Sequence, residues 1–417
     1  MRAAHNALYY FMKQFILALA LLGFARPFHL FAQSPLIEEE AVKLFRSQNP
    51  EQKRLLHLIE EAEAERREAR LYENPEFSWS REALFSSDSK EDIFSLSAPL
   101  SVTGRYELSR LSADFAFAEK KGALEWRIFE LENNFRESFY DLFRAQERIR
   151  AVTEGLAKLK NLTTALHGRG RSDLYDQLRV NKEASEMETL LEKSRIEEKL
   201  KLAVLNRFLG QASSSTFQIV GSLDPQRKIP SLQAVAVFVQ KRPDRLGLEA
   251  ALKKEDSILR LVRRGRIPDI KLTAGMKKTG EPNETGYVAG LSLDLPVFDR
   301  GQHRQEQARA RQKIVNAEIE AWELEKRLSL ETLYSLAQRR RSLLKSYQQT
   351  TLRQAEQLER TVGISYLEGR RTLLELIDGY RESLETQLRL LELSHESILA
   401  DLALERLCGV PLENVHE

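Results

Sequence analysis

Two very long segments of this chain contain no proline. The first lies between Pro99 and Pro225 and the second between Pro296 and Pro411, although the chain has 12 prolines in all. Proline inside a helix removes a backbone hydrogen bond and clashes with the preceding turn, so its absence leaves both segments free to form long helices. Prolines are frequent in the stretches that precede them, and we expect a different kind of structure there.

An internal repeat underlies this proline pattern. Five pairs of short segments match in the same order: Asn74–Phe77 with Ile267–Ile270, Phe94–Leu100 with Leu291–Val297, Glu137–Tyr140 with Glu331–Tyr334, Gly170–Leu174 with Gly369–Leu373, and Arg207–Gly210 with Arg406–Gly409. The offset of roughly 200 residues is far longer than a solenoid repeat and indicates duplication of a whole subdomain. We therefore divide the chain into a first repeat over 36–211, a linker over 212–231, a second repeat over 232–410 and a tail over 411–417.

Each repeat is expected to begin with a charged helix, over 36–71 and 232–265, and to continue with two strands. We expect these strands at about 76–86 and 91–101 in the first repeat, and at about 268–278 and 286–296 in the second. Ile270, Leu272 and Ala274 alternate with polar or small residues, which is the period of a strand with one apolar face. Strands of about ten residues cross a bilayer when tilted. A soluble hairpin with one face on a core shows the same alternation, so both interpretations stay open.

After the strands, each repeat is expected to form a very long helical hairpin, over 105–210 and over 302–409. Apolar residues of the first hairpin follow one another at steps of three and four, with Ser138 in the one polar position: Leu124, Ile128, Leu131, Phe135, Leu142, Ala145, Ile149, Val152, Leu156 and Leu159. Such a seam is typical of coiled-coil packing. A helix of about 63 residues would be about 95 Å long.

The number of strands constrains how such a chain could lie in a membrane. Four strands cannot close a barrel, and an open edge in lipid leaves backbone groups unpaired at a cost of several kcal/mol each. If the strands are membrane-borne, the chain must therefore assemble with copies of itself.

Composition and motifs exclude several classes of function. Lys and Arg number 64 against 62 for Asp and Glu, so the basic excess of a nucleic-acid binder is missing. The one cysteine, Cys408, excludes disulfides within the chain and cysteine-cluster metal sites, and the seven histidines never fall at metal-ligand spacing. No catalytic triad order or phosphate-binding loop is present. We therefore expect no enzyme, no cofactor and no metal site.

The N-terminus is expected to be a cleaved signal peptide over residues 1–33. Lys13 precedes an apolar run from Phe15 to Phe24, and Ala32 lies at a suitable distance for cleavage. A run of about ten apolar residues is too short to span a bilayer, which needs about 20. A buried or anchoring segment is the alternative interpretation.

The order of these elements resembles the TolC-like outer membrane efflux proteins over about residues 36–410. The segments that carry the resemblance are Arg242–Asp244, Leu248–Leu252, Pro268–Leu272, Leu291–Gly301, Tyr366–Gly369 and Leu373–Ile377. The resemblance implies a mainly α protein with a β-barrel portion, which trimerises into a 12-stranded barrel and an α-helical tube. It also implies an outer-membrane location in a diderm bacterium, a periplasmic adaptor and an inner-membrane pump of the resistance-nodulation-division type. The segment at the end of the last strand, Leu291–Gly301, slightly favours the heavy-metal branch of this family.

The same resemblance assigns roles to residues at the tips of the hairpins. Those expected to contact the adaptor are Gly170, Asp173, Leu174, Gly369, Thr372 and Leu373, and those expected to form a periplasmic gate are Glu375, Asp378, Arg381 and Glu382. The alternative interpretations are that the glycines only end helices in a left-handed conformation and that the charged residues form a solvated helix face.

Three functions remain open at this point. The architecture suits the export of metal ions or small toxic compounds, and equally a channel for type I protein secretion. A structural coiled-coil protein of the periplasm would explain the heptads and the export signal, but not the paired strands at the same place in both repeats. The chain also departs from many relatives in having no N-terminal cysteine for a lipid anchor and in the basic first turn, Gly168–Arg171.

Overall fold

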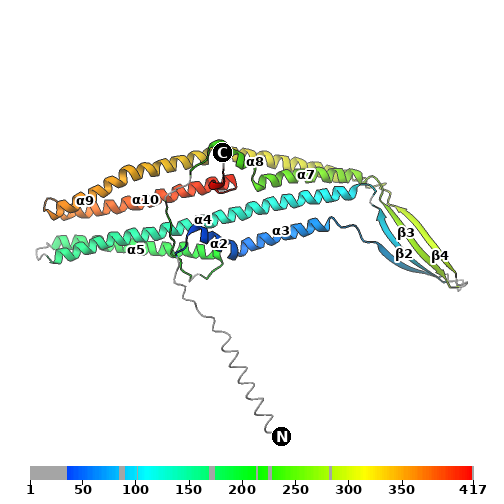
Figure 1. Ribbon diagram of the computed structural model, residues 1–417, viewed down its shortest axis with the longest axis horizontal. Helices are drawn as coiled ribbons and strands as arrows, with labels where there is room; N and C mark the ends of the chain where they lie inside the picture. The colour runs from blue at the N-terminus through cyan, green and yellow to red at the C-terminus, as the bar shows by residue number, and fades with distance from the viewer. Residues whose placement is uncertain are drawn as a thin grey trace, which may run out of the picture.

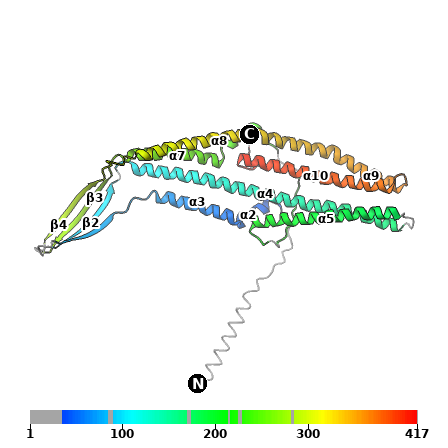
Figure 2. The same ribbon diagram turned by 180° about the vertical axis from the view of Figure 1, so that it is seen from behind.

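The computed structural model describes residues 35–83, 90–100, 102–168, 174–212, 215–223, 228–280 and 284–415. The signal peptide expected over 1–33 lies outside the described residues. The molecule is elongated, with a sheet at one end and the tips of two helical hairpins at the other (Figure 1). Helix α2 and the end of α10 lie near the middle of its length, as the view from behind also shows (Figure 2).

Each charged helix that was expected as one segment is divided in two, and the second part begins at Pro50 or at Pro243. The described helices are α2 (Glu38–Gln48), α3 (Pro50–Glu68), α4 (Arg105–Gly168), α5 (Leu174–Leu209), α6 (Leu232–Gln240), α7 (Pro243–Arg264), α8 (Gln302–Tyr347), the π-helical turn η1 (Gln348–Leu352), α9 (Arg353–Leu367), α10 (Leu373–Cys408) and the 3-10 turn η2 (Leu412–Asn414). Helix α4 alone has 64 residues, which corresponds to about 96 Å. In the second repeat the outgoing helix is made of α8, η1 and α9 together.

The four strands form one antiparallel sheet in the order β1-β2-β3-β4. The strands are β1 (Glu76–Ala83), β2 (Lys90–Leu100), β3 (Ile270–Thr279) and β4 (Thr285–Leu293). Pairing of β2 with β3 joins the two repeats edge to edge. The strand expected to reach 296 ends at Leu293, before Pro296, whose missing N–H suits the region just beyond a strand.

Register gives this sheet one apolar face and one polar face. Trp79, Phe94, Met276 and Tyr287 lie opposite one another in a single row across all four strands. On the other face the hydroxyls of Ser78 and Ser95 lie 2.7 Å apart, and those of Ser97 and Thr273 lie 2.9 Å apart. The large apolar side chains of the first face are exposed in the single chain, except Ile270, which is half-buried. The sheet is therefore a single layer, and its apolar face has no partner in the described part of the chain.

The coiled-coil seam is buried mainly in the C-terminal half of α4, which is nearer the hairpin tip. Phe135, Leu142, Val152 and Leu159 are buried, whereas Leu124, nearer the sheet, is only half-buried. Helices α5 and α10 supply the other side of this core, with Leu191, Leu205, Leu384 and Leu402 among their buried residues. Within the described residues, no helix combines the length and the apolar content needed to span a membrane.

Near mid-length, equivalent residues of the two repeats connect the end of one helix to the start of another. In the first repeat they connect α5 to α3, and in the second they connect α10 to α7. In the first repeat the Asn49 side chain donates to the carbonyl of Phe208, at 2.6 Å. In the second, Arg242 donates to the carbonyls of Arg406 and Leu407 and lies 3.7 Å from the centre of the Trp126 ring. These contacts satisfy carbonyls that the ends of α5 and α10 would otherwise leave unpaired.

Helices α4 and α7 cross closely at two glycines, which yields a first prediction. A Cβ on Gly122 would lie 2.4 Å from the carbonyl oxygen of Pro243 and 3.0 Å from Cα of Gly247. Gly122→Leu should therefore force the helices apart and lower the free energy of unfolding by about 3 kcal/mol. Thermal unfolding followed by circular dichroism measures this, with Gly363→Ala as the control because that position has open space. Equal melting temperatures for the Gly122→Leu protein and the original chain would contradict the crossing.

Candidate functional site

The turn at the tip of the second hairpin depends on a glycine and a capping box. Gly369 has a φ of 73°, a left-handed conformation that costs other residues strain, and no atom lies within 4 Å of where its Cβ would be. Thr372 caps the N-terminus of α10: its hydroxyl accepts from the N–H of Glu375 at 3.3 Å, and its own N–H donates to the Glu375 carboxylate at 2.8 Å. Conformation rather than lack of space therefore selects glycine at position 369.

Glu375, predicted as a gate residue, is occupied by this cap. The N–H of Thr372 and the guanidinium of Arg371 lower the pKa of the Glu375 carboxyl, so that it stays charged at the N-terminus of α10. Its position is explained by helix geometry, and its gate role stays a prediction.

The residues predicted for adaptor contact differ in their surroundings. Leu174, Gly369 and Thr372 are exposed, whereas Gly170 and Asp173 lie outside the described residues. The side chain of Leu373 is buried in a small core with Leu162, Val180, Leu376 and Ile377. Leu373 therefore offers no side-chain surface to a partner in this conformation, which corrects the expectation for that residue. As the first residue of α10 it packs inward to close the end of the hairpin core.

Sequence reasoning missed an exposed apolar strip beside the tips. Tyr175 and Leu178 continue from Leu174 along α5, and Ile364 and Leu367 end α9 on the second hairpin. The sequence could have revealed this strip. These residues are apolar, but neighbouring positions of the same helices already supply the side chains of the hairpin core. We call the six exposed residues Leu174, Tyr175, Leu178, Ile364, Leu367 and Gly369 the tip surface.

The four predicted gate residues are brought to one stretch of α10, and one of them connects the two hairpins. The guanidinium of Arg381 lies 3.3 Å from the carboxylate of Glu183 on α5 and 3.7 Å from that of Asp378 one turn earlier. The hydrogen bond to Glu183 raises the pKa of Arg381. Glu382 is exposed beside it. Arg381 thus forms a contact between the two hairpins, and Asp378 supports it.

A second contact between the hairpins was not predicted. Lys158 on α4 forms an ion pair with Glu359 on α9, and Glu359 also accepts from the hydroxyl of Ser383 on α10. The ammonium of Lys158 lies 5.8 Å from the centre of the Tyr380 ring, and burial raises the pKa of that tyrosine. Lys158 and Glu359 are 201 residues apart, so only the packed repeats bring them together. We call Lys158, Glu183, Glu359, Tyr380, Arg381 and Ser383 the tip clasp.

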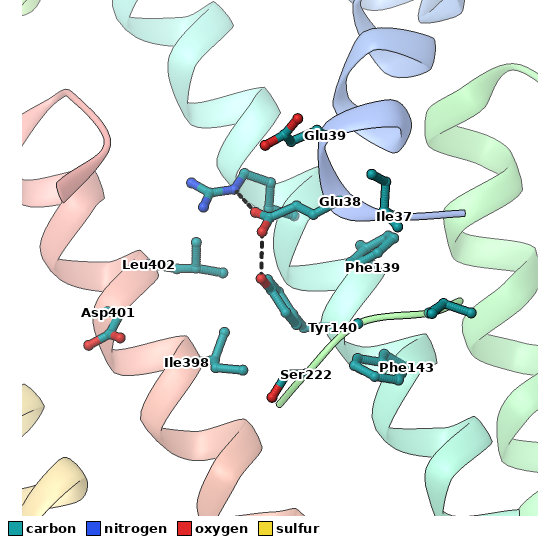
Figure 3. Close-up of a pocket in the computed structure, with 13 residues that line it drawn as sticks. Ile37, Glu38, Glu39, Phe139, Tyr140, Phe143, Ser222, Ile398, Asp401 and Leu402 are labelled. Atoms are coloured by element: carbon teal, nitrogen blue, oxygen red, sulfur yellow. Dashed lines mark hydrogen bonds and ion pairs between the residues drawn. The ribbon is translucent and has the colours of Figure 1, made fainter. Parts of the chain in front are cut away.

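A buried charge network lies at mid-length, beside a pocket of about 340 Å³. Glu38 accepts from Arg136 at 2.6 Å and from the Tyr140 hydroxyl at 2.6 Å, and Figure 3 shows Glu38 and Tyr140 pointing toward one another. Arg136 also pairs with Glu405, whose side chain is fully buried. Burial acts to lower the pKa of Arg136, but the two carboxylates outweigh it and raise that pKa. The network joins α2, α4 and α10. Its charged groups are paired with one another, so we interpret its role as structural.

Comparison with known proteins decides the family. The model of the outer membrane efflux protein family matches residues 238–410, which lie in the second repeat. The cobalt-zinc-cadmium resistance protein CzcC of Cupriavidus metallidurans is 22% identical over 392 residues, or 91% of each chain. The second repeat therefore matches the outer membrane efflux protein family. The nickel and cobalt resistance protein CnrC of the same organism is 25% identical over 134 residues, covering 32% of this chain and 31% of that one.

Solved structures of membrane channels share the fold. A structure of CusC superposes with a TM-score of 0.73 at 16% identity, covering 92% of this chain and 96% of that one. The open state of the MtrE outer membrane channel of Neisseria gonorrhoeae gives a TM-score of 0.74 at 15% identity, covering 90% and 89%. The expected mainly α fold with an antiparallel strand portion is therefore confirmed. The match to this efflux family supports an outer-membrane channel component and argues against a purely structural coiled coil.

Proposed function

We propose that the protein is the outer-membrane conduit of a tripartite system that exports divalent transition-metal cations. The observation that carries the proposal is the sheet with one apolar and one polar face, continuous with helical hairpins about 100 Å long. The cargo is argued from the similarity to CzcC, a cobalt-zinc-cadmium resistance protein, over 91% of the chain. The channel itself performs no chemistry, because a wide aqueous conduit need not bind what passes through it.

The proposed assembly is a homotrimer, and surfaces that one chain leaves unpartnered support it. Strands β1 and β4 are the open edges of the sheet, and pairing β1 of one copy with β4 of the next would close it. The helices offer matching stripes of exposed apolar residues: Ile196, Leu200 and Val204 on α5, and Ile314, Leu324 and Leu328 on α8. Three copies of four strands make the 12-stranded barrel that the family resemblance implies.

The hairpin tips are the proposed site of contact with a periplasmic adaptor, which in turn binds an inner-membrane pump. The tip surface is apolar and exposed at the end of the molecule farthest from the sheet. Thr372 and Gly369 fix the shape of the turn, and Leu174 supplies apolar area. An exposed apolar surface of this kind is more stable in contact with another protein, here a helical end of the adaptor, than in contact with water.

The tip clasp is the proposed gate. It joins α5 to α10 through Glu183 and Arg381, and α4 to α9 through Lys158 and Glu359. Separation of the two hairpins would have to break both pairs, so the clasp favours the arrangement seen here. Docking of the adaptor at the adjacent tip surface could replace these contacts.

Metal tolerance in a host without its own channel of this family tests the proposal. We expect that the chain, expressed together with the adaptor and pump of such a metal-efflux system, lowers the cellular content of zinc, cobalt and cadmium. Cells that carry the pump and adaptor alone are the control. Tolerance restored only to organic compounds would point to drug efflux, and release of a secreted protein would point to type I secretion. Either result would overturn the metal proposal.

A further inference from the structure

The base of the sheet, where the four strands meet the helices, carries a collar of exposed apolar residues. The collar consists of Leu71, Tyr72, Leu100, Val102, Ile267, Leu295, Val297 and Phe298. Phe298 is 94% exposed, more than any other large apolar side chain among the described residues. Exposing a phenylalanine to water is unfavourable, so its position between the sheet and the helices needs an explanation.

The backbone beside Phe298 is held firmly. The carboxylate of Asp299 accepts from the N–H of Gly301 at 2.8 Å and from the guanidinium of Arg304 at 2.6 Å. Gly301, with a φ of 73°, directly precedes α8. The outward position of Phe298 is therefore fixed by the turn, and the charge of Asp299 is already used within it.

Three exposed arginines without acidic partners lie in this turn or at the end of α7, which packs against it. Gly301 packs against Val262, since a Cβ on it would lie 2.9 Å from a methyl carbon of that residue, and this places Arg300 beside the end of α7. Arg263 and Arg266 follow at that end. All three arginines are exposed, and none has a carboxylate partner among the described residues. Neighbouring cations are engaged, because Arg105 pairs with Asp269 and Arg264 donates to the carbonyl of Thr103.

The first repeat provides an internal comparison. By the alignment of Pro268 with Pro75 and of Pro296 with Pro99, its equivalents of Arg263 and Arg266 are Arg70 and Glu73. The equivalents of Phe298 and Arg300 are Ser101 and Thr103. Arg70 is already paired with Asp114, at 2.6 Å. At these aligned positions the first repeat therefore lacks the aromatic residue and has one paired arginine, which argues against a general requirement of the fold.

We propose that this part of the collar binds an anionic phospholipid of the periplasm-facing leaflet. Phe298 and Val297 enter the acyl region, and Arg263, Arg266 and Arg300 bind the phosphate. Aromatic side chains favour the membrane interface, and guanidinium groups bind phosphate oxygens through paired hydrogen bonds. Bilayer phospholipid is the source because the collar continues into the apolar face of the sheet at Leu291 and Leu293, along which acyl chains would lie. The inference rests on the outer-membrane location and not on the metal cargo or the adaptor.

Native mass spectrometry of the full-length protein, extracted in mild detergent and titrated with defined lipids, tests the site. The original protein should retain phosphatidylglycerol in preference to phosphatidylcholine, because each arginine near an anionic lipid strengthens association about five-fold. The Arg263→Gln/Arg266→Gln/Arg300→Gln variant should lose this preference, and Phe298→Ser should weaken retention of both lipids. The control variant Arg339→Gln/Arg353→Gln/Arg360→Gln removes the same charge from exposed positions on α8 and α9 and should behave like the original protein.

Three outcomes would overturn the assignment. They are equal retention of the two phospholipids by the original protein, loss of preference in the control variant, and preferred retention of lipid A, which belongs to the opposite leaflet. Circular dichroism of each variant checks that it is folded. Metal export by the triple variant is a separate measurement, so failure of the lipid site and failure of the proposed function are distinguishable.

Discussion

Replacing Gly369 with proline is expected to abolish export while leaving the protein in the outer membrane. The residue has a φ of 73°, which proline cannot adopt, and its N–H donates to the carbonyl of Tyr366 at 3.0 Å. The substitution should therefore disrupt the turn that positions the tip surface. The sheet lies at the opposite end of the molecule from this turn and should not change (Figure 1).

Metal content of cells and the amount of assembled protein in the outer membrane are the two measurements needed. Gly369→Asn is the matched control, because asparagine tolerates the left-handed conformation better than other residues with a side chain. It should export normally. Full metal resistance in cells whose Gly369→Pro protein is made and assembled would contradict the docking role of this turn.

Removing the charge of Glu405 is expected to cause the largest loss of stability. The side chain is fully buried, pairs with the buried Arg136, and accepts from the N–H of Leu412 at 3.2 Å. Glu405→Gln leaves Arg136 with Glu38 as its single remaining charge partner. Breaking a buried pair in this way costs about 3–5 kcal/mol, because the remaining charge has lost its compensation.

An exposed pair of the same chemistry provides the comparison for Glu405. Glu51 and Arg54 lie 2.7 Å apart on the surface of α3, and Glu51→Gln should cost at most about 1 kcal/mol. Thermal unfolding followed by circular dichroism compares the two variants with the original protein. If both lowered the melting temperature equally, the buried network would not be the link between α2, α4 and α10 that its geometry indicates.

Much of the fold was predictable because its signals are local. Proline-free segments with apolar residues at steps of three and four predict long helices, and α4 begins at Arg105, where the hairpin was expected to start. Alternation from Ile270 predicts β3, and the repeat predicts where its counterpart in the first half should lie. The pairing of β2 with β3 was not predictable, because it depends on how the two repeats pack.

The candidate site was predictable only in part. The resemblance places Gly369 and Thr372 at a turn, and the geometry there agrees with a left-handed glycine followed by a capping box. Burial of Leu373 could not be foreseen, since exposure depends on Leu162 and Val180 of the other hairpin. The ion pair of Lys158 with Glu359 could not be predicted either, because the two residues meet only when the hairpins lie side by side.

Electron cryo-microscopy of the protein extracted from the outer membrane tests the central claim most directly. We expect a threefold particle in which β1 of each copy pairs with β4 of the next, so that three sheets of four strands close one barrel. The helical hairpins should continue from it as one tube about 100 Å long. A particle in which the β1 and β4 edges stay unpaired, or in which the apolar face of the sheet packs against helices, would contradict it.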